Sequence, residues 1–176
     1  GAGGNGGGGL CCGRHLHNRG LGIHLVLDRE AEDLRGATGD QLGILQAAGL
    51  SPLPADQAEE MIRRADLVVD TLIGYSLRGA PRGRAAELIE LCNRHATRVL
   101  SLDVPSGLDA TTGLAPGVVV QPERTLTLAL PKTGLRGLPG ELVLADIGIP
   151  PEVSDSIGVP YQAPFNDDYF VPLMEA

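Results

Sequence analysis

Short apolar runs alternate with amphipathic segments along the 176 residues of this chain. Residues 21–27 are a nearly unbroken apolar run, which is typical of a strand buried on both faces of a parallel sheet, and residues 66–74 are expected to form the next buried strand. Residues 98–103 repeat the pattern of a strand that ends in an acidic residue. Further strands, joined by loops rather than by long helices, are expected at residues 118–120, 125–130 and 142–147.

Apolar residues at helical spacing separate these strands. Helices are expected at residues 10–17, 38–48, 55–65 and 84–96. Thr38 and Asp40 are candidate caps of the second helix, and Gly49 is its stop. The alternation predicts a single α/β domain over residues 1–176 with a mostly parallel sheet.

The last segment, residues 151–176, is rich in proline and holds most of the few aromatic residues. It is expected to wrap the surface or to form an oligomer contact, such as that of a homodimer.

The chain begins with a run of glycines, residues 1–9, which Ala2 and Asn5 interrupt. Glycine is a poor helix and strand former and leaves backbone N–H groups unshielded, so the run predicts a loop that curls around an anion. A flexible linker is the alternative. The helical pattern that follows directly favours a phosphate cradle, because the N-terminus of a helix attracts anions.

Composition and charge disfavour several classes of protein. The formal net charge of −8 argues against a sequence-independent nucleic-acid binder, which needs a basic surface. No apolar run is long enough to span a membrane and no signal peptide is recognisable, so a cytoplasmic protein without a membrane contact is expected. The three cysteines form neither a disulfide framework nor a metal-binding spacing.

Three strand ends carry charged residues that a parallel sheet brings to one edge: Asp70, Asp103 and Lys132. Asn5 and the amides of the glycine loop join them at that edge, which is the layout of an active site.

The first six residues also fit the dinucleotide-binding pattern G-x-G-x-x-G, with Asp28 where such a fold places its ribose-binding acid. The fit is nonspecific. The lysine of a P-loop is absent, and no hydride-transfer site is recognisable, which disfavours an ATPase, a kinase and an oxidoreductase.

Longer motifs are more specific. They are Gly3–Leu10 followed by Arg14-His15-Leu16, then Val69–Gly79, then Leu102–Asp109 with Thr112-Gly113, and finally Ala129–Lys132. In this order they closely resemble the NAD(P)H-hydrate epimerase family, also called the YjeF N-terminal domain. The resemblance runs from Gly3 to about Pro150 and implies a Rossmann-like fold, with three α/β/α layers around a mostly parallel central sheet.

The resemblance implies an isomerase of metabolite repair that interconverts the R and S forms of hydrated NADH or NADPH, called NADHX and NADPHX. A separate dehydratase, which accepts only the S form, then restores the cofactor. The resemblance also implies a potassium ion, K+, near the substrate. Its side-chain ligands would be Asn5 and Asp70, joined by oxygens of the turn that reaches Ser106, and Asp103 would face the nicotinamide ring as the catalytic acid.

Substrate binding is implied for Gly4, Asn5, Gly6, Gly7, Gly8, Gly74, Tyr75, Ser76, Leu77, Arg78, Gly79, Ala80 and Asp103. The chain departs from the family's usual loop, Gly-x-Gly-Asn-Asn-Gly-Gly-Asp-Gly, at Gly4 and Gly8, which removes two polar substrate contacts. Family members also carry a helical segment and a core strand before the loop. Both are missing from this sequence, so the sheet is expected to lack a central strand.

The competing interpretation is a non-catalytic YjeF-type domain that binds a nucleotide or a protein partner as a scaffold. The glycines that replace polar loop residues favour the scaffold. The joint presence of Asn5, Asp70, Asp103 and Ser106 favours the enzyme, because a scaffold needs no cation site.

Overall fold

The computed structural model describes residues 1–158 and 161–173. Five strands form one sheet in the spatial order β1-β2-β3-β4-β5. Their bounds are β1 Val68–Asp70, β2 Val99–Leu102, β3 Arg124–Leu128, β4 Glu141–Ala145 and β5 Phe170–Pro172. β1 to β4 are parallel and β5 is antiparallel to β4, which confirms the mostly parallel α/β sheet.

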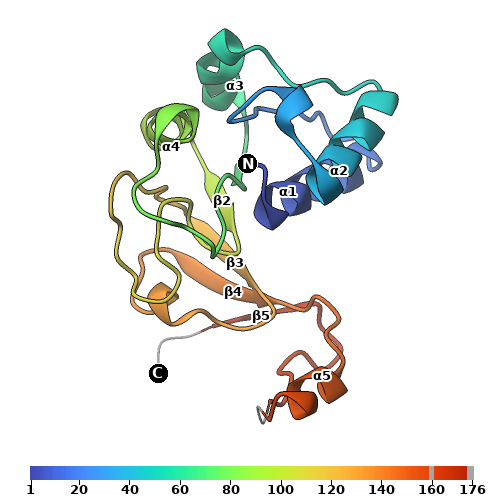
Figure 1. The fold of residues 1–176 in the computed structure, drawn as a ribbon, viewed down its shortest axis with the longest axis vertical. Coiled ribbons are helices and arrows are strands. Elements are labelled where there is room, and N and C mark those ends of the chain that lie inside the picture. Colours follow the sequence, from blue (N-terminus) through green and yellow to red (C-terminus); the bar gives the residue numbers. More distant parts are fainter. Residues whose placement is uncertain (159–160, 174–176) are drawn as a thin grey trace.

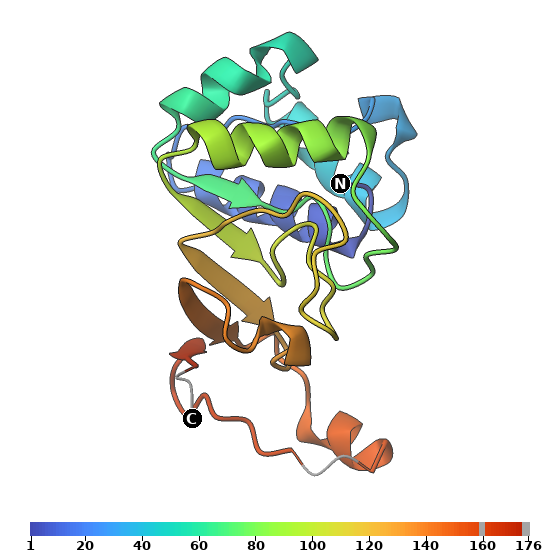
Figure 2. The ribbon, with the colours of Figure 1, turned by 90° about the vertical axis from the view of Figure 1, so that its left-hand side faces the viewer.

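The helices are α1 Gly4–His17, α2 Gly36–Ala47, α3 Ala58–Arg64, α4 Gly83–His95 and α5 Pro151–Ser156. α4 lies on one side of the sheet and α1 on the other, so the layers are those of a Rossmann-like fold (Figure 1). Figure 2 shows α4 in front of the strands and α1 behind them. Within the described residues, no helix combines the length and the apolar character that a membrane crossing requires.

The amphipathic faces predicted from the spacing build two separate apolar clusters. In the first, Leu10 of α1 packs with Leu45 of α2. In the second, Ile62 of α3 and Leu88 of α4 pack together against Val68 of β1. The clusters hold the helices in place beside the strand ends, where the polar residues gather.

The glycine run differs most from the prediction. Residues 4–9 are not a loop but the first turns of α1, which begins at Gly4 rather than at Leu10. A Cβ at Gly6 would lie 1.8 Å from the carbonyl oxygen of Gly1, and one at Gly9 would lie 2.2 Å from the hydroxyl oxygen of Thr71. These glycines let α1 approach the end of β1, and this packing outweighs their low helix propensity.

We expect alanine to have opposite effects at two glycines of α1. Gly4 has open space where a Cβ would stand, so Gly4→Ala should raise the free energy of unfolding by about 0.5–1 kcal/mol. Gly9→Ala should lower it by about 1–3 kcal/mol, because its methyl group overlaps Thr71. Urea unfolding of the two variants measures the contrast, and equal effects would show that the helix does not need the close approach at Gly9.

Three further predictions are corrected. Residues 21–27 are not a strand; a single bridge pairs Leu25 with Pro52. Residues 118–120 are not a strand either, because Val120 packs in an apolar cluster beneath α4 and donates its N–H to the Ser106 carbonyl at 2.9 Å. Thr38 does not cap α2 but lies inside it, and its hydroxyl donates to the backbone carbonyls of residues 2 and 3 at 3.2 and 3.1 Å.

The tail contains a strand that its sequence did not predict. β5 pairs with β4, with Val171 opposite Leu144. Part of residues 151–176 therefore extends the sheet. Prolines and exposed aromatic residues interrupt the alternation of apolar and polar positions in this segment, so periodicity alone does not predict its short strand.

Candidate functional site

Asp70 ends β1 and is buried beneath the site. Its carboxylate oxygens accept hydrogen bonds from the hydroxyls of Ser101 at 2.8 Å and Ser106 at 2.5 Å. They also accept the backbone N–H groups of Ser106 at 2.9 Å and Leu72 at 3.2 Å. Burial raises the pKa of the Asp70 carboxyl, although these hydrogen bonds act in the opposite direction. Asp70 thus ties the turn after β1 to the turn after β2.

The Ser106 hydroxyl has a second partner besides Asp70. Its oxygen accepts the N–H of Ile73 at 2.8 Å and lies 3.2 Å from the carbonyl oxygen of the same residue. Rotation of the hydroxyl moves its proton from Asp70 to Ile73, which leaves one lone pair of the Asp70 carboxylate free.

Asp103 follows β2 and is held in an unusual backbone conformation. Its φ of 69° lies in the left-handed region, which is uncommon for residues other than glycine, asparagine and aspartate. Its carboxylate accepts a hydrogen bond from the ammonium of Lys132, and the two side chains are only 8% and 20% exposed. Lys132 also donates to the Thr127 hydroxyl at 3.2 Å and to the Leu128 carbonyl at 2.7 Å. The ion pair therefore has a fixed geometry.

Asn5 lies in the first turn of α1, and both polar atoms of its side chain are buried without a hydrogen-bond partner among the described residues. A Cβ at Gly74 would lie 3.0 Å from the Asn5 Cβ and 3.6 Å from the Asp103 Oδ2. Asn5 and Asp103 thus meet over the bare backbone of Gly74. A buried amide without a partner is costly, which makes this amide a candidate contact for a bound group.

The segment predicted to be a phosphate-binding loop is the N-terminus of α1 in the structure. No side chain caps α1, so the N–H groups of its first turn stay available to an anion. Gly6 and Gly7 do not line an open loop, because their missing side chains would point at Gly1 and at Thr38. Gly4 faces open space, and a Cβ at Gly8 would lie 3.1 Å from the side chain of Leu102.

The remaining predicted substrate residues form a rim beyond Gly74. Tyr75 is 74% exposed, and Arg78 is exposed in the same loop. Ala80 contacts Gly117, where a Cβ would lie 2.9 Å from its own. Ser76, Leu77 and Gly79 complete the loop and are exposed or half-buried.

Two residues make contacts that the sequence did not predict. Lys132 lies at the predicted edge, and its pairing with Asp103 depends on the fold, because 29 residues separate them. Asp28, the candidate ribose acid, accepts two hydrogen bonds from its neighbour Arg29, both at 3.0 Å.

Comparisons with known proteins identify the family of this chain. Residues 1–134 match the family model described as YjeF-related protein N-terminus. The chain is 51% identical to an NAD(P)H-hydrate epimerase of Dehalogenimonas lykanthroporepellens, over 98% of this chain and 70% of that protein. It is 36% identical to an NAD(P)H-hydrate epimerase of Truepera radiovictrix, over 93% of this chain and 74% of the relative.

Longer relatives and a solved structure extend the comparison. A bifunctional NAD(P)H-hydrate repair enzyme of Moorella thermoacetica is 40% identical over 85% of this chain, which spans 30% of that enzyme. The crystal structure of a yeast protein superposes with a TM-score of 0.83 and 22% identity, covering 98% of this chain and 74% of the yeast chain, and it supports the fold. By its family model and by relatives that it matches over most of their length, this chain belongs to the YjeF N-terminal family of NAD(P)H-hydrate epimerases, which are isomerases.

Proposed function

We propose that this chain interconverts the R and S forms of hydrated NADH and NADPH. The proposal rests on one observation. The Asn5 amide, which has no hydrogen-bond partner among the described residues, and the buried Asp103 carboxylate, which is paired with Lys132, both lie next to Gly74. The names of the relatives supply the substrate class, and the geometry supplies an acid–base group in a closed setting.

The chemistry needs a proton on the hydroxyl oxygen of the carbon that epimerises. When that hydroxyl is protonated, the C–O bond breaks, its electron pair leaves with water, and the lone pair of the ring nitrogen forms a C=N bond. Water then adds from the other face and gives up one proton, so atoms and charge balance. We assign this transfer to Asp103: its protonated carboxyl gives the proton, the carboxylate so formed takes one back from the attacking water, and Lys132 lies within hydrogen-bond distance to hold the group in place.

The substrate's diphosphate is assigned to the first turn of α1 together with the loop from Gly74 to Ala80. Free N–H groups at a helix N-terminus bind phosphate oxygens, and Arg78 is exposed nearby to add a positive charge. The overall charge of −8 makes such a local arrangement necessary, because the protein's general field repels the substrate.

A potassium ion fits the donors at this site. K+ prefers several oxygen ligands, and Asn5 offers a buried amide oxygen that has no partner. Asp70 offers a lone pair once the Ser106 hydroxyl turns to Ile73, and that hydroxyl oxygen and the carbonyls of the Val104–Ser106 turn are further donors. The ion would add positive charge near the substrate.

The activity is tested with R-NADHX and an S-specific dehydratase, following recovery of NADH. We expect recovery well above the spontaneous epimerisation rate. Recovery at the spontaneous rate would favour the scaffold interpretation, which predicts that nucleotide binding persists without turnover.

For the cation, we expect activity to fall when K+ is replaced by Li+ and Asn5→Ala to abolish that dependence. A crystal soaked in Tl+ should show an anomalous peak between Asn5 and Asp70. A crystal without that peak would contradict the cation proposal and would leave the epimerase test unaffected.

We propose coupling to a dehydratase because several relatives are bifunctional NAD(P)H-hydrate repair enzymes. The homodimer through residues 151–176 and the cytoplasmic location stay predictions. Size-exclusion chromatography with light scattering tests the dimer, since a monomer at micromolar concentration would contradict it.

A further inference from the structure

Lys132 stands out among the basic residues of this chain. The sequence contains 14 lysines and arginines, and Lys132 is the only lysine among them. Its ammonium carries three N–H donors, and each has an acceptor: the Oδ1 of Asp103, the Thr127 hydroxyl at 3.2 Å and the Leu128 carbonyl at 2.7 Å. The position of the ammonium therefore depends on all three acceptors.

A tight turn lets Lys132 reach back to the end of β3. The turn is centred on Ala129, whose φ of 64° lies in the left-handed region, and a backbone hydrogen bond of 2.7 Å closes it. Beyond Lys132, the N–H of Gly134 donates to the Ala110 carbonyl at 2.9 Å. Because the backbone is held on both sides of Lys132, the remaining freedom belongs to the lysine side chain, and its acceptors set where the ammonium lies.

The two carboxylate oxygens of Asp103 have different surroundings. Oδ1 accepts a hydrogen bond from Lys132 and the N–H of Leu128 at 3.4 Å. Oδ2 lies beside Gly74, where a Cβ would be 3.6 Å from it. A protonated carboxyl oxygen becomes a donor, and an ammonium offers only donors, so a proton on Oδ1 would oppose the N–H of Lys132. A neutral Asp103 therefore carries its proton on Oδ2, on the side of Gly74 and Asn5.

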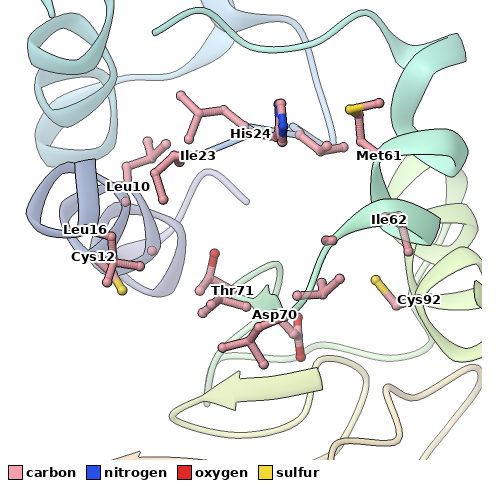
Figure 3. A pocket seen from close by; sticks show the side chains of 18 of the residues that line it. Leu10, Cys12, Leu16, Ile23, His24, Met61, Ile62, Asp70, Thr71 and Cys92 are labelled. Carbon is pink, nitrogen blue, oxygen red and sulfur yellow. The ribbon is translucent and has the colours of Figure 1, made fainter. Parts of the chain in front are cut away.

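Asp70, the other acidic strand end, lacks this asymmetry. Hydroxyl and backbone N–H groups donate to both of its oxygens. It borders a cavity of about 420 Å³ whose lining includes neither Asp103 nor Lys132, and Figure 3 shows it there beside Thr71. Of these two acids, only Asp103 has a cation that distinguishes its two oxygens.

Thr127 is the acceptor of the ammonium that belongs neither to Asp103 nor to the backbone. It lies on β3 and is 0% exposed, so it does not touch a bound substrate. Without its hydroxyl, one N–H of the half-buried Lys132 would lose its acceptor, which is costly. The ammonium could then turn toward Oδ2 of Asp103 and cover the oxygen that carries the proton.

We propose that Thr127 is a positioning residue, which holds the Lys132 ammonium on Oδ1 of Asp103 and thereby keeps Oδ2 available for proton exchange with the substrate. This inference rests on the proposed function, in which Asp103 is the acid–base group. Protons balance, because Oδ2 gives one to the departing hydroxyl and recovers one from the water that adds.

Three variants of β3 test the role of the hydroxyl. Thr127→Val removes it and keeps the branched shape, whereas Thr127→Ser keeps it and removes a methyl group. Thr125→Val is the matched control, because Thr125 is buried on the same face of β3 and accepts no hydrogen bond from Lys132 among the described residues.

The dehydratase-coupled assay with R-NADHX separates kcat from KM. We expect Thr127→Val to lower kcat about 10- to 100-fold and to keep KM within about twofold, because the reacting group is misplaced while the substrate contacts persist. Thr127→Ser and Thr125→Val should keep kcat within about threefold.

A second measurement follows the ammonium without turnover. Labelling with [ε-15N]lysine gives a single side-chain signal, since Lys132 is the only lysine. We expect its protons to exchange with water at least about tenfold faster in Thr127→Val than in the unchanged protein, Thr127→Ser or Thr125→Val. Absent epimerase activity in the unchanged protein would contradict the proposed function, whereas this exchange measurement would still test the position of the ammonium.

Lys132→Arg leaves β3 unaltered and serves if Thr127→Val does not fold. The guanidinium keeps the charge, but its planar fork does not match acceptors that surround one ammonium, so kcat should fall at least about tenfold. Unchanged kcat in Thr127→Val or in Lys132→Arg would overturn the inference, and so would unchanged proton exchange in Thr127→Val. An equal loss of kcat in Thr125→Val would also overturn it, because the packing of β3 would then account for the effect.

Discussion

Asp103→Asn is expected to lower kcat/KM for R-NADHX by about 10²- to 10⁴-fold, the range over which a general acid–base group contributes. The amide cannot give and recover the proton, and it loses the charge that Lys132 pairs with. The side chain keeps its size, so the backbone conformation of Asp103 and the contact over Gly74 should persist. The dehydratase-coupled assay, run at several substrate concentrations, measures the change in kcat and in KM separately.

Asp109→Asn is the matched control in the same turn. Asp109 accepts the N–H groups of Thr111 at 3.0 Å and Thr112 at 2.8 Å, and its side chain has no hydrogen bond to Asn5 or Lys132 among the described residues. We expect this variant to keep kcat/KM within about twofold of the unchanged protein. If Asp103→Asn kept full activity, or if both variants lost activity equally, the assignment of Asp103 as the acid–base group would be wrong.

Asp70→Ala is expected to lower the free energy of unfolding by about 3–5 kcal/mol. The substitution removes the acceptor for four donors and leaves the Ser101 hydroxyl and the Ser106 backbone N–H buried without partners. Asp70→Asn keeps one acceptor oxygen and should cost about 1–3 kcal/mol. Urea unfolding with fluorescence or circular dichroism compares them, and a loss below about 1 kcal/mol for alanine would show that the network contributes little.

The raised pKa of Asp70 adds a pH dependence with a definite sign. The folded protein holds the proton of this carboxyl above the ordinary pKa of 3.8, where the unfolded chain has already lost it. The contribution of this proton to the free energy of unfolding is therefore complete below pH 3.8, and it is lost as pH rises through the folded-state pKa. Between pH 3.8 and the folded-state pKa of Asp70, the free energy of unfolding of the unchanged protein should fall relative to that of Asp70→Asn. Above that pKa the difference between the two proteins should stay constant.

The sequence by itself was enough to place the chemistry at one edge of a sheet. Asp70 and Asp103 each follow a buried apolar run, and parallel strands bring such ends together whatever their spacing along the chain. The amphipathic spacing of α4 was equally clear, because one face must be buried. Local patterns of this kind depend only on neighbouring residues.

Tertiary structure determines the helical conformation of the glycine run, the conformation of residues 21–27 and the pairing of the site residues. Low helix propensity at Gly6 and Gly9 predicts a loop, yet close packing against Gly1 and Thr71 makes them helical. An apolar run becomes a strand only when a partner strand pairs with it, and within the described residues the segment 21–27 has only the single bridge from Leu25 to Pro52. The contact of Lys132 with Asp103 likewise arises from the return of the chain through β3, which no local pattern encodes.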